Sequence, residues 1–466
     1  MSRIVWIASA VFALAITALG IDRYVTYHSG ADLGEFVQTI ATPLSGFGDT
    51  PEGGSHFLHH FSPLLYLLSP LLLAARTPVV LIAVQAVACA LTAPAVFLIA
   101  RRRMDERLAA LVACIALVYP ALVGVAFTDF HENCFAPATI AWLIWAIDVR
   151  RFRLAAPLAA AALAIKEDEA LVLAALAAGY AIYSRRRGDA AGTRFGAAAC
   201  AASLLTFGAY FALVRPMAGG HDTWFAVDYY VRSAGDTPHG AAIVLGRLTF
   251  VLEVLVPLAL VPLASPAFLL AIPGLVEVLG SRWSITYTMG QHYAGVWIAE
   301  VLVAFAFGIA RIAATHPRRA WALARVALAL CVLDLIVASP THWGHYLRAR
   351  NAHDAALDAL VERIPPGATV ATYDEVYAHL GFDPGAQIGF TPEPLPAYAL
   401  FDERYDGGAW LRVYRPRLEQ LVSAGRYRAA ASADGATLYR RVDPASLRGG
   451  MPRATATRTL VATWIR

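Results

Sequence analysis

The sequence predicts a mainly α-helical membrane protein, a polytopic bundle of about eleven transmembrane helices followed by a small α/β domain. Hydrophobic residues make up 58% of the chain and charged residues only 15%, whereas soluble domains carry roughly 25% charged residues. Apolar runs long enough to cross about 30 Å of hydrocarbon recur between residues 4 and 338. Most of the surface is therefore expected to face lipid and not water.

The expected spans are separated by clusters of arginine. In chain order, the spans lie near residues 4–20, 78–100, 107–127, 134–149, 153–166, 168–184, 195–214, 248–263, 266–280, 293–311 and 320–338. The clusters at 101–103, 150–153, 185–187 and 311–319 then fall on the same side as Arg3. Because positively charged loops stay in the cytoplasm, this pattern predicts the cytoplasmic (inner) membrane, a cytoplasmic N-terminus and an extracytoplasmic C-terminus.

Residues 56–75 are apolar enough to span, but counting them would place Arg101–Arg103 outside. We therefore expect a surface helix there, interrupted by Pro63 and Pro70, within a long first outer loop at 21–77. The transmembrane domain is predicted to cover residues 1–340.

After Pro340 the composition becomes that of an ordinary folded domain. Residues 341–442 are expected to form an extracytoplasmic α/β domain, with a strand at 368–372 and a β-hairpin that turns at Asp434-Gly435. Residues 443–466 are expected to be poorly ordered. The net charge of +4 gives no support for nucleic-acid binding. The five cysteines lie within or at the ends of apolar runs, which favours buried thiols over a disulfide framework.

Four patches of polar residues gather on the predicted outer side. In the first, Asp32 and Glu35 are three residues apart, so both carboxylates lie on one face of a short helix. A carboxylate there can act as a general base or a metal ligand. The alternative is that Asp32 caps the helix and Glu35 completes a capping box.

The second patch contains His56, His59 and His60, and no cysteine or HExxH pattern accompanies them. Interfacial histidines beside aromatic residues are favoured there over a zinc site. The third patch, Asp129, His131 and Glu132, is the polar tip of a short hairpin between two spans. It is either a functional cluster or only the solvated turn that such a hairpin needs.

The fourth patch, Lys166-Glu167-Asp168-Glu169, places four consecutive charges between two apolar halves. Such charges are costly at a membrane boundary unless they line a cavity or stay hydrated. Lys166 is the only lysine of the chain, and all the other permanently charged basic side chains are arginines. A lone compact ammonium suggests a phosphate ligand, with chance retention of the residue as the alternative.

Other polar residues are weaker candidates. Gln291-His292-Tyr293 begins a predicted span, next to aromatic residues typical of an interfacial belt. Glu253, Glu300 and Asp334 fall inside predicted spans, where acidic side chains are functional candidates by default.

An ordered set of motifs resembles the family known as domain of unknown function 2079, over most of the chain. The motifs are DLGEF (32–36), HHFSPLLYLLSPL (59–71), VYPAL (118–122), FTDFHEN (127–133), AIKEDEAL (164–171), QHY (291–293) and IPPGATV (364–370). That family is similar to the GT-C glycosyltransferases, which move sugars from polyprenyl-phosphate donors to acceptors on the outer side of a membrane. The resemblance implies a GT-C-like bundle in the bilayer, a polyprenyl-phosphate sugar donor and an acceptor of unknown identity.

The resemblance also implies roles for particular residues. Asp32, with Glu35, would be the catalytic carboxylate, and Lys166 would bind the donor phosphate together with His60 and His292. The first loop lacks the Asp-Glu pair or Asp-x-Asp of several GT-C families. A divalent cation such as Mg²⁺ or Mn²⁺ would therefore need further ligands, for which the candidates and supporting residues are Glu35, Asp129, His131, Glu132, Glu167 and Asp168.

Two rival hypotheses remain open. A transporter or flippase of a lipid-linked or anionic solute would use the acids at 253, 300 and 334 near the midplane of the membrane, although the chain shows no clear internal repeat. A non-catalytic scaffold would leave the outer charges facing apart.

Overall fold

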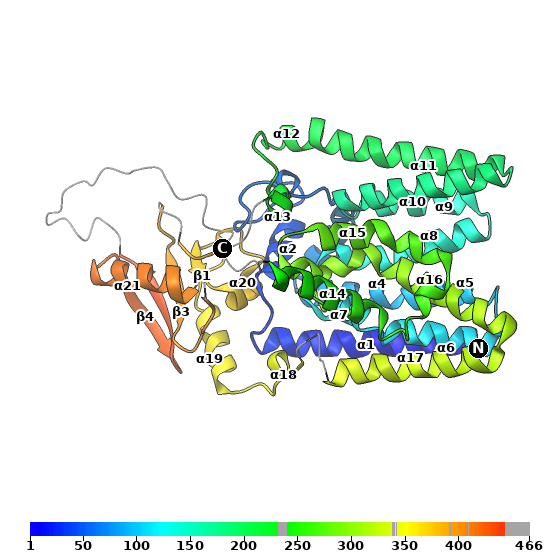
Figure 1. The fold of residues 1–466 in the computed structure, drawn as a ribbon. Helices are drawn as coiled ribbons and strands as arrows, with labels where there is room; N and C mark the ends of the chain where they lie inside the picture. The colour runs from blue at the N-terminus through cyan, green and yellow to red at the C-terminus, as the bar shows by residue number, and fades with distance from the viewer. Residues whose placement is uncertain (232–239, 338–340, 342, 391–393, 409, 443–466) are drawn as a thin grey trace. The chain divides into compact units, whose positions relative to one another are not determined.

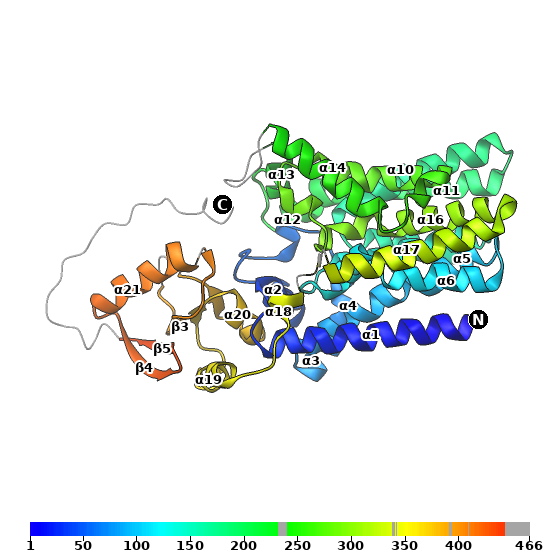
Figure 2. The same ribbon diagram turned by 60° about the horizontal axis from the view of Figure 1, so that its bottom comes forward.

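The computed structural model describes residues 1–231, 240–337, 341, 343–390, 394–408 and 410–442. The chain divides into two compact units (Figures 1 and 2). The helical unit consists of Met1–Gly20, His56–Leu68 and Val79–His345, and the mixed unit consists of Ile21–Ser55, Ser69–Pro78 and Tyr346–Arg466. The tail predicted to be poorly ordered, 443–466, lies outside the described residues.

Each predicted span contains helix among its described residues, but the span at 248–263 is interrupted after Leu255, where Ala259 and Leu260 have positive φ. Up to residue 186 the helices are α1 (Ser2–Val25), α4 (Val79–Ala90), α5 (Thr92–Ala100), α6 (Glu106–Leu117), α7 (Pro120–Phe127), η3 (Glu132–Phe135), α8 (Ala136–Asp148), α9 (Phe152–Leu163) and α10 (Glu167–Arg186). Next come α11 (Ala190–Ala209), the π-turn η4 (Tyr210–Val214), α12 (Arg215–Met217), η5 (Phe225–Val227), α13 (Asp228–Val231), α14 (Ala241–Leu255) and η6 (Val261–Ala264). The last are η7 (Pro266–Ala271), α15 (Ile272–Gly280), η8 (Ser284–Tyr287), η9 (His292–Ala294), α16 (Gly295–Thr315), α17 (Pro317–Val337) and α18 (Trp343–Tyr346).

Among the described residues, five helical segments are long and apolar enough to cross a membrane. They are Ser2–Val25, Val79–Ala100, Ala190–Met217, His292–Thr315 and Pro317–Val337. A sixth is added if α6 and α7, which meet at a bend of 46°, form one span. Pro120 begins α7 and explains the bend, because proline has no amide hydrogen to continue the helix. The count of eleven spans stays a prediction.

Small residues allow the helices of this unit to pack closely. Ala141, Ala155 and Ala162 are buried in a cluster between α8 and α9. The helix α16 is buried along most of its length and packs against α5, α8, α17 and the η6–η7 segment. A Cβ on Gly308 would lie 2.4 Å from the carbonyl oxygen of Val261, so only glycine permits that approach.

The arginine clusters meet at one end of the helical unit. Arg102 forms an ion pair with Asp148 at 2.9 Å, which joins the α5–α6 turn to the end of α8. Arg150 pairs with Asp189, which joins the α8–α9 turn to the α10–α11 turn. The turns that the sequence placed on one side therefore do lie together, while the side of the membrane on which they lie stays a prediction.

Residues 56–75 form three short pieces: η1 (His56–Leu58), η2 (Pro63–Leu68) and α3 (Ser69–Ala75). Pro63 begins η2 and Pro70 lies in the first turn of α3, as expected for a ring that cannot donate a backbone hydrogen bond inside a helix. The peptide nitrogen of Leu64 donates to the carbonyl of Ala164 at 2.9 Å, which fixes η2 on the α9–α10 turn.

The mixed unit contains the predicted α/β domain. Its strands are β1 (Val370–Thr372), β2 (Ala386–Ile388), β3 (Tyr398–Asp402), β4 (Tyr427–Ala433) and β5 (Ala436–Arg441), and its helices after residue 346 are α19 (Ala352–Val361), α20 (Asp374–Leu380), the π-turn η10 (Trp410–Tyr414) and α21 (Arg415–Ser423). The sheet order is β2-β1-β3-β5-β4, with β1 parallel to β2 and β3, and β5 antiparallel to β3 and β4. Both Asp434 and Gly435 have positive φ, at 46° and 93°, which confirms the predicted tight hairpin.

The helix α2 (Ala31–Ala41) belongs to the mixed unit and packs on α20. Gly34 permits this contact, because a Cβ there would lie 2.5 Å from the ring of Tyr377. The Gln38 carboxamide donates to the carbonyl of Asp383 at 2.9 Å and accepts from the Tyr377 hydroxyl at 2.8 Å. The DLGEF segment is thus held on the C-terminal domain by shape and by buried hydrogen bonds.

Candidate functional site

A pocket of about 350 Å³ lies in the helical unit, where the α9–α10 turn meets the segments around η1, η5, α13 and α15. Its titratable lining residues are His60, Lys166, Glu167, Asp168 and Glu277, and its aromatic lining residues are Phe207, Trp224, Tyr229, Tyr230 and Tyr293. Figure 1 shows α12 and α13 at the end of the bundle opposite the N-terminus. The structure therefore brings Lys166, His60, Glu167 and Asp168, four of the residues singled out in the sequence, into one cavity.

Lys166 forms a buried ion pair with Glu132. The ammonium nitrogen lies 3.2 Å from Oε1 of Glu132, and the two residues are 6% and 0% exposed. Burial alone would raise the pKa of the Glu132 carboxyl, but the neighbouring charges, Lys166 first among them, oppose it and lower that pKa to about 2. Glu132 is therefore a carboxylate at neutral pH and keeps a positive charge at the wall of the pocket.

His60 and Glu167 form a second pair beside the first. Nδ1 of His60 lies 2.9 Å from Oε1 of Glu167, and the other carboxylate oxygen accepts a hydrogen bond of 2.7 Å from the peptide nitrogen of Phe61. Both oxygens of Glu167 are thus occupied, and the His60 ring is fixed with its other nitrogen available for a ligand.

Two further carboxylates line the pocket. Asp168 accepts a hydrogen bond of 2.8 Å from the peptide nitrogen of Glu169, in the first turn of α10. Glu277 lies on α15, and its charge interacts with that of Asp168. Within the described part of the chain, the Glu277 carboxylate forms no hydrogen bond or ion pair.

Aromatic rings form much of the rest of the wall. The indole nitrogen of Trp224 donates to the carbonyl of His59 at 2.8 Å, so the polar edge of that ring is satisfied. Tyr229 packs at right angles to Tyr293, with 6.4 Å between the ring centroids. The flat faces of such aromatic rings are apolar, and they suit the faces of sugar rings or an organic cation.

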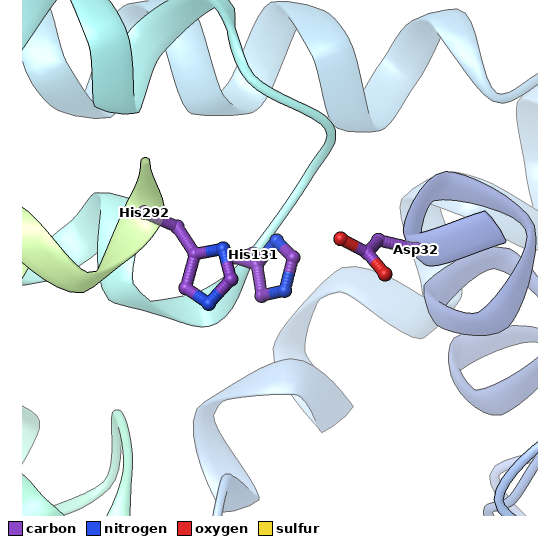
Figure 3. A group of neighbouring side chains, drawn as sticks. All are labelled: Asp32, His131 and His292. Atoms are coloured by element: carbon purple, nitrogen blue, oxygen red, sulfur yellow. The ribbon is translucent and has the colours of Figure 1, made fainter. Parts of the chain in front are cut away.

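The hairpin tip places its three ionisable residues differently. Glu132 turns to Lys166, whereas the ring of His131 stacks on that of His292, with 3.4 Å between centroids (Figure 3). The peptide nitrogen of His131 donates to Oε1 of Gln85 at 3.0 Å. Neither Asp129 nor His292 lines the pocket, although Tyr293, the next residue after His292, does.

Asp32 and Glu35 lie on α2 of the mixed unit (Figure 3 also labels Asp32). Gly30 is the N-cap residue and no side chain caps the helix, so the alternative in which Asp32 caps it is wrong. The reason is that the helix begins at Ala31, which places Asp32 inside the first turn. Burial, and then the charges of Asp32 and Asp49, raise the pKa of the Glu35 carboxyl well above its usual value.

The predicted divalent metal stays a prediction. Among the described residues of the helical unit, no three carboxylate, imidazole or thiolate ligand atoms lie close enough together to share an ion. Glu132 and Glu167, two of the expected ligands, are instead committed to Lys166 and His60. The three histidines at 56, 59 and 60 likewise form no zinc site of their own.

Sequence reasoning missed Glu277, Phe207 and Trp224 as pocket residues. The sequence does carry a signal for Glu277, because it is the only charged residue in the predicted span 266–280. The two aromatic residues carried no comparable signal. Away from the pocket, Glu300 is buried on α16, and its carboxylate accepts no hydrogen bond from the described residues.

The helices, their apolar composition and the pocket at one end of the bundle define an integral membrane protein with a polar site. A family model described as "Predicted membrane protein (DUF2079)" matches residues 23–382, and the chain belongs to that family. No curated protein sequence matches the chain.

The solved structures that resemble the chain have the GT-C fold. ArnT from Cupriavidus metallidurans bound to undecaprenyl phosphate aligns over 96% of this chain and 99% of its own, with 12% identity and a TM-score of 0.59. Its apo form aligns over the same shares with 13% identity and a TM-score of 0.58. The archaeal oligosaccharyltransferase AglB from Archaeoglobus fulgidus, in complex with an inhibitory peptide and a dolichol-phosphate, covers 85% of this chain and 61% of its own, with 14% identity and a TM-score of 0.39. The alignment with ArnT shows that the chain shares the fold of this GT-C glycosyltransferase, as the resemblance of the sequence motifs implied.

Proposed function

We propose that this protein is a membrane glycosyltransferase that transfers a sugar from a polyprenyl-phosphate donor to an acceptor on the extracytoplasmic side of the membrane. The observation that carries the proposal is the pocket in which a buried lysine and a histidine face aromatic rings. The GT-C fold supports it, because a structure of similar fold holds a polyprenyl phosphate.

In this proposal Lys166 and His60 bind the donor phosphate. Glu132 keeps Lys166 charged inside a dry wall, and Glu167 orients the His60 ring. Fixed donors in such a site stabilise the negative charge that develops on the leaving phosphate more effectively than water does. His292, which lies outside the lining, would act on the donor only through its neighbours.

The catalytic carboxylate is assigned to Asp32, by the resemblance of the DLGEF segment. It would accept the proton of the acceptor hydroxyl as that oxygen attacks the anomeric carbon. The bond between the anomeric carbon and the phosphate oxygen breaks, and the polyprenyl phosphate leaves with the electron pair. Burial raises the pKa of the Glu35 carboxyl, which favours the protonated form, and in that form Glu35 would donate a hydrogen bond to the acceptor or to Asp32.

A transporter is the second candidate, and Glu300 is the observation that favours it. An acid that is buried in a membrane helix without a hydrogen bond from the described residues is a candidate coupling group. Glu253 and Asp334, the other two acids of this hypothesis, are only half-buried.

The test compares glycans of the cell envelope in a strain that lacks the gene and in complemented strains. We expect Asp32→Asn, and the double variant Glu132→Leu with Lys166→Met, to leave the deletion phenotype uncorrected at membrane levels equal to the unmodified protein. The double variant is used because Lys166→Met alone would leave the Glu132 carboxylate buried without its counter-charge. Glu253→Gln serves as the matched control, because it removes a half-buried acid outside the pocket. If both variants restore the glycans fully, the glycosyltransferase hypothesis is refuted. If only Glu253→Gln and Glu300→Gln fail to restore them, the transporter hypothesis is favoured.

A further inference from the structure

The charges of the C-terminal α/β domain are distributed unevenly along the chain. Residues 352–406 contain ten aspartates and glutamates and two arginines, whereas residues 412–441 contain seven arginines and only two acids. Both of these acids, Glu419 and Asp434, already form ion pairs with arginines. The part of the domain that contains β4 and β5 therefore carries a net positive charge, which favours an anionic partner.

Two of these arginines face each other across neighbouring strands. Arg428 on β4 lies directly opposite Arg440 on β5, and Arg440 lies directly opposite Tyr398 on β3 (Figure 2 labels the three strands). Side chains in such register project from one face of a sheet, with Cβ atoms about 5 Å apart, so these three residues form an arginine row. Both arginines are exposed, and neither guanidinium forms an ion pair or a hydrogen bond with the described residues.

Protection of the sheet edge explains only one of the two arginines. Charged side chains on an edge strand hinder its pairing with other chains, and β4 is such an edge, which accounts for Arg428. Arg440 has no such role, because β5 lies between β3 and β4 and has no free edge. Like charges placed directly opposite each other destabilise a sheet. An anion held between the two guanidinium groups would remove this repulsion, because each group can donate a fork of hydrogen bonds to it.

Phospholipid headgroups are the anions that suit a site of only two exposed arginines. One arginine near an anionic lipid surface strengthens binding about fivefold, so the pair supplies about 25-fold, which is too little to hold a dilute soluble anion. The chain passes between the mixed unit and the membrane-spanning helical unit at five places, after residues 20, 55, 68, 78 and 345. These connections keep the mixed unit near a bilayer, where headgroups are present at high effective concentration.

We propose that the arginine row binds the phosphate groups of anionic phospholipids and so holds the sheet of the mixed unit at the headgroup layer of the membrane. The two guanidinium groups donate to phosphate oxygens, and the hydroxyl of Tyr398 adds a further donor to the same row. This surface takes no part in the glycosyltransferase reaction, so either proposal can fail without the other. A soluble phosphorylated ligand would use the same chemistry, and the experiment distinguishes it from the lipid.

The test uses the full-length protein in phosphatidylcholine nanodiscs that contain a trace of phosphatidylglycerol with a photoreactive headgroup. Mass spectrometry maps the cross-linked peptides. We expect labelling of residues 426–441 to fall about fivefold in Arg428→Gln or Arg440→Gln and about 25-fold in the double variant. Arg417→Gln is the matched control, because it removes an exposed arginine of α21 in the same domain, and it should keep the labelling within about twofold. Labelling at the Arg101–Arg103 turn should stay unchanged in every variant.

The melting midpoint of the double variant shows whether it is folded. It should equal or exceed that of the unmodified protein, because the variant loses a pair of like charges. Unchanged labelling in the single and double variants would overturn the inference. Equal labelling by a photoreactive phosphatidylcholine would also overturn it, because the labelling would then report only proximity to the bilayer. Complete loss of labelling with micromolar glycerophosphoglycerol would overturn it in favour of a soluble phosphate ligand.

Discussion

Removing one member of the Lys166–Glu132 pair should destabilise the protein far more than removing both. At 3.2 Å, and with an effective dielectric constant of about 20, the attraction between the two charges is worth about 5 kcal/mol. Most of this attraction offsets the cost of taking two ions out of water. Glu132→Gln leaves the ammonium buried without its counter-charge, and we expect it to lower the free energy of unfolding by about 3–5 kcal/mol.

The double variant Glu132→Leu with Lys166→Met removes both charges and keeps the volume nearly constant. We expect it to lie within about 1 kcal/mol of the unmodified protein in stability, so the cycle should show a coupling of several kcal/mol. The assay is unfolding of the detergent-purified protein in a denaturant series, followed by tryptophan fluorescence. The double variant should also fail in glycan complementation, which separates stability from function.

Asp148→Asn is the control, because Asp148 pairs with Arg102 and Arg103 at the arginine-rich end, where all three side chains are partly exposed. Screened surface pairs are worth at most about 1 kcal/mol. The reasoning would be refuted if Glu132→Gln and Asp148→Asn cost the same, or if the two single variants simply added up in the double variant.

Four further outcomes follow from the structure. Gly34→Ala should lower the thermal midpoint of unfolding, because its Cβ would lie 2.5 Å from the Tyr377 ring on α20. In Gly179→Ala the new Cβ meets nothing within 4 Å, so this variant should raise the free energy of unfolding by up to about 1 kcal/mol in a melting assay. Burial raises the pKa of the Glu375 carboxyl to about 8, so the folded protein keeps a proton that the unfolded chain releases. The free energy of unfolding should therefore fall as the pH rises from about 4.5 to 8, by at most about 1.4 kcal/mol per pH unit. Glu375→Gln should remove that slope in pH-dependent melts. Burial lowers the pKa of His379 to about 4, so stability should fall as pH drops from about 6.5 to 4, and His379→Gln should flatten that limb of the same profile. Glu300→Leu should raise stability by about 1–3 kcal/mol and keep glycan complementation, whereas loss of complementation in a stable variant would contradict the enzyme.

The membrane bundle could be predicted because its signals are local. An apolar run of about twenty residues specifies a helix without reference to anything else in the chain, and arginine clusters mark one end of each hairpin. The ion pairs of Arg102 and Arg150 bear this out, since they join turns that the sequence had assigned to one side. The hairpin at Asp434-Gly435 was predictable for a similar reason, because few residues accept positive φ at two successive positions.

Pairing across the fold was not predictable from one sequence. Lys166 was evident as an isolated lysine, but nothing in the local sequence indicated that its counter-charge is Glu132, which lies 34 positions earlier on another hairpin. The same holds for the contact between Gly34 and Tyr377, which fixes α2 on the C-terminal domain. Aspartate favours the N-cap position, which made Asp32 a candidate cap, yet the N-cap residue is Gly30, two positions earlier, because cap preferences do not determine the register of a helix start.

The buried charges favour the proposed function over a non-catalytic scaffold. In a non-catalytic scaffold, buried ion pairs would bring no gain in stability, because apolar residues of similar volume make a protein equally stable or more stable. The pocket instead keeps Lys166 charged through Glu132, and holds the ring of His60 through Glu167. A compact ammonium with three donors can serve Glu132 and still offer hydrogen to a ligand, whereas the planar guanidinium used everywhere else in this chain presents five donors in a fixed fork. In the proposed function, the single lysine would satisfy a buried carboxylate and an anionic ligand at the same time.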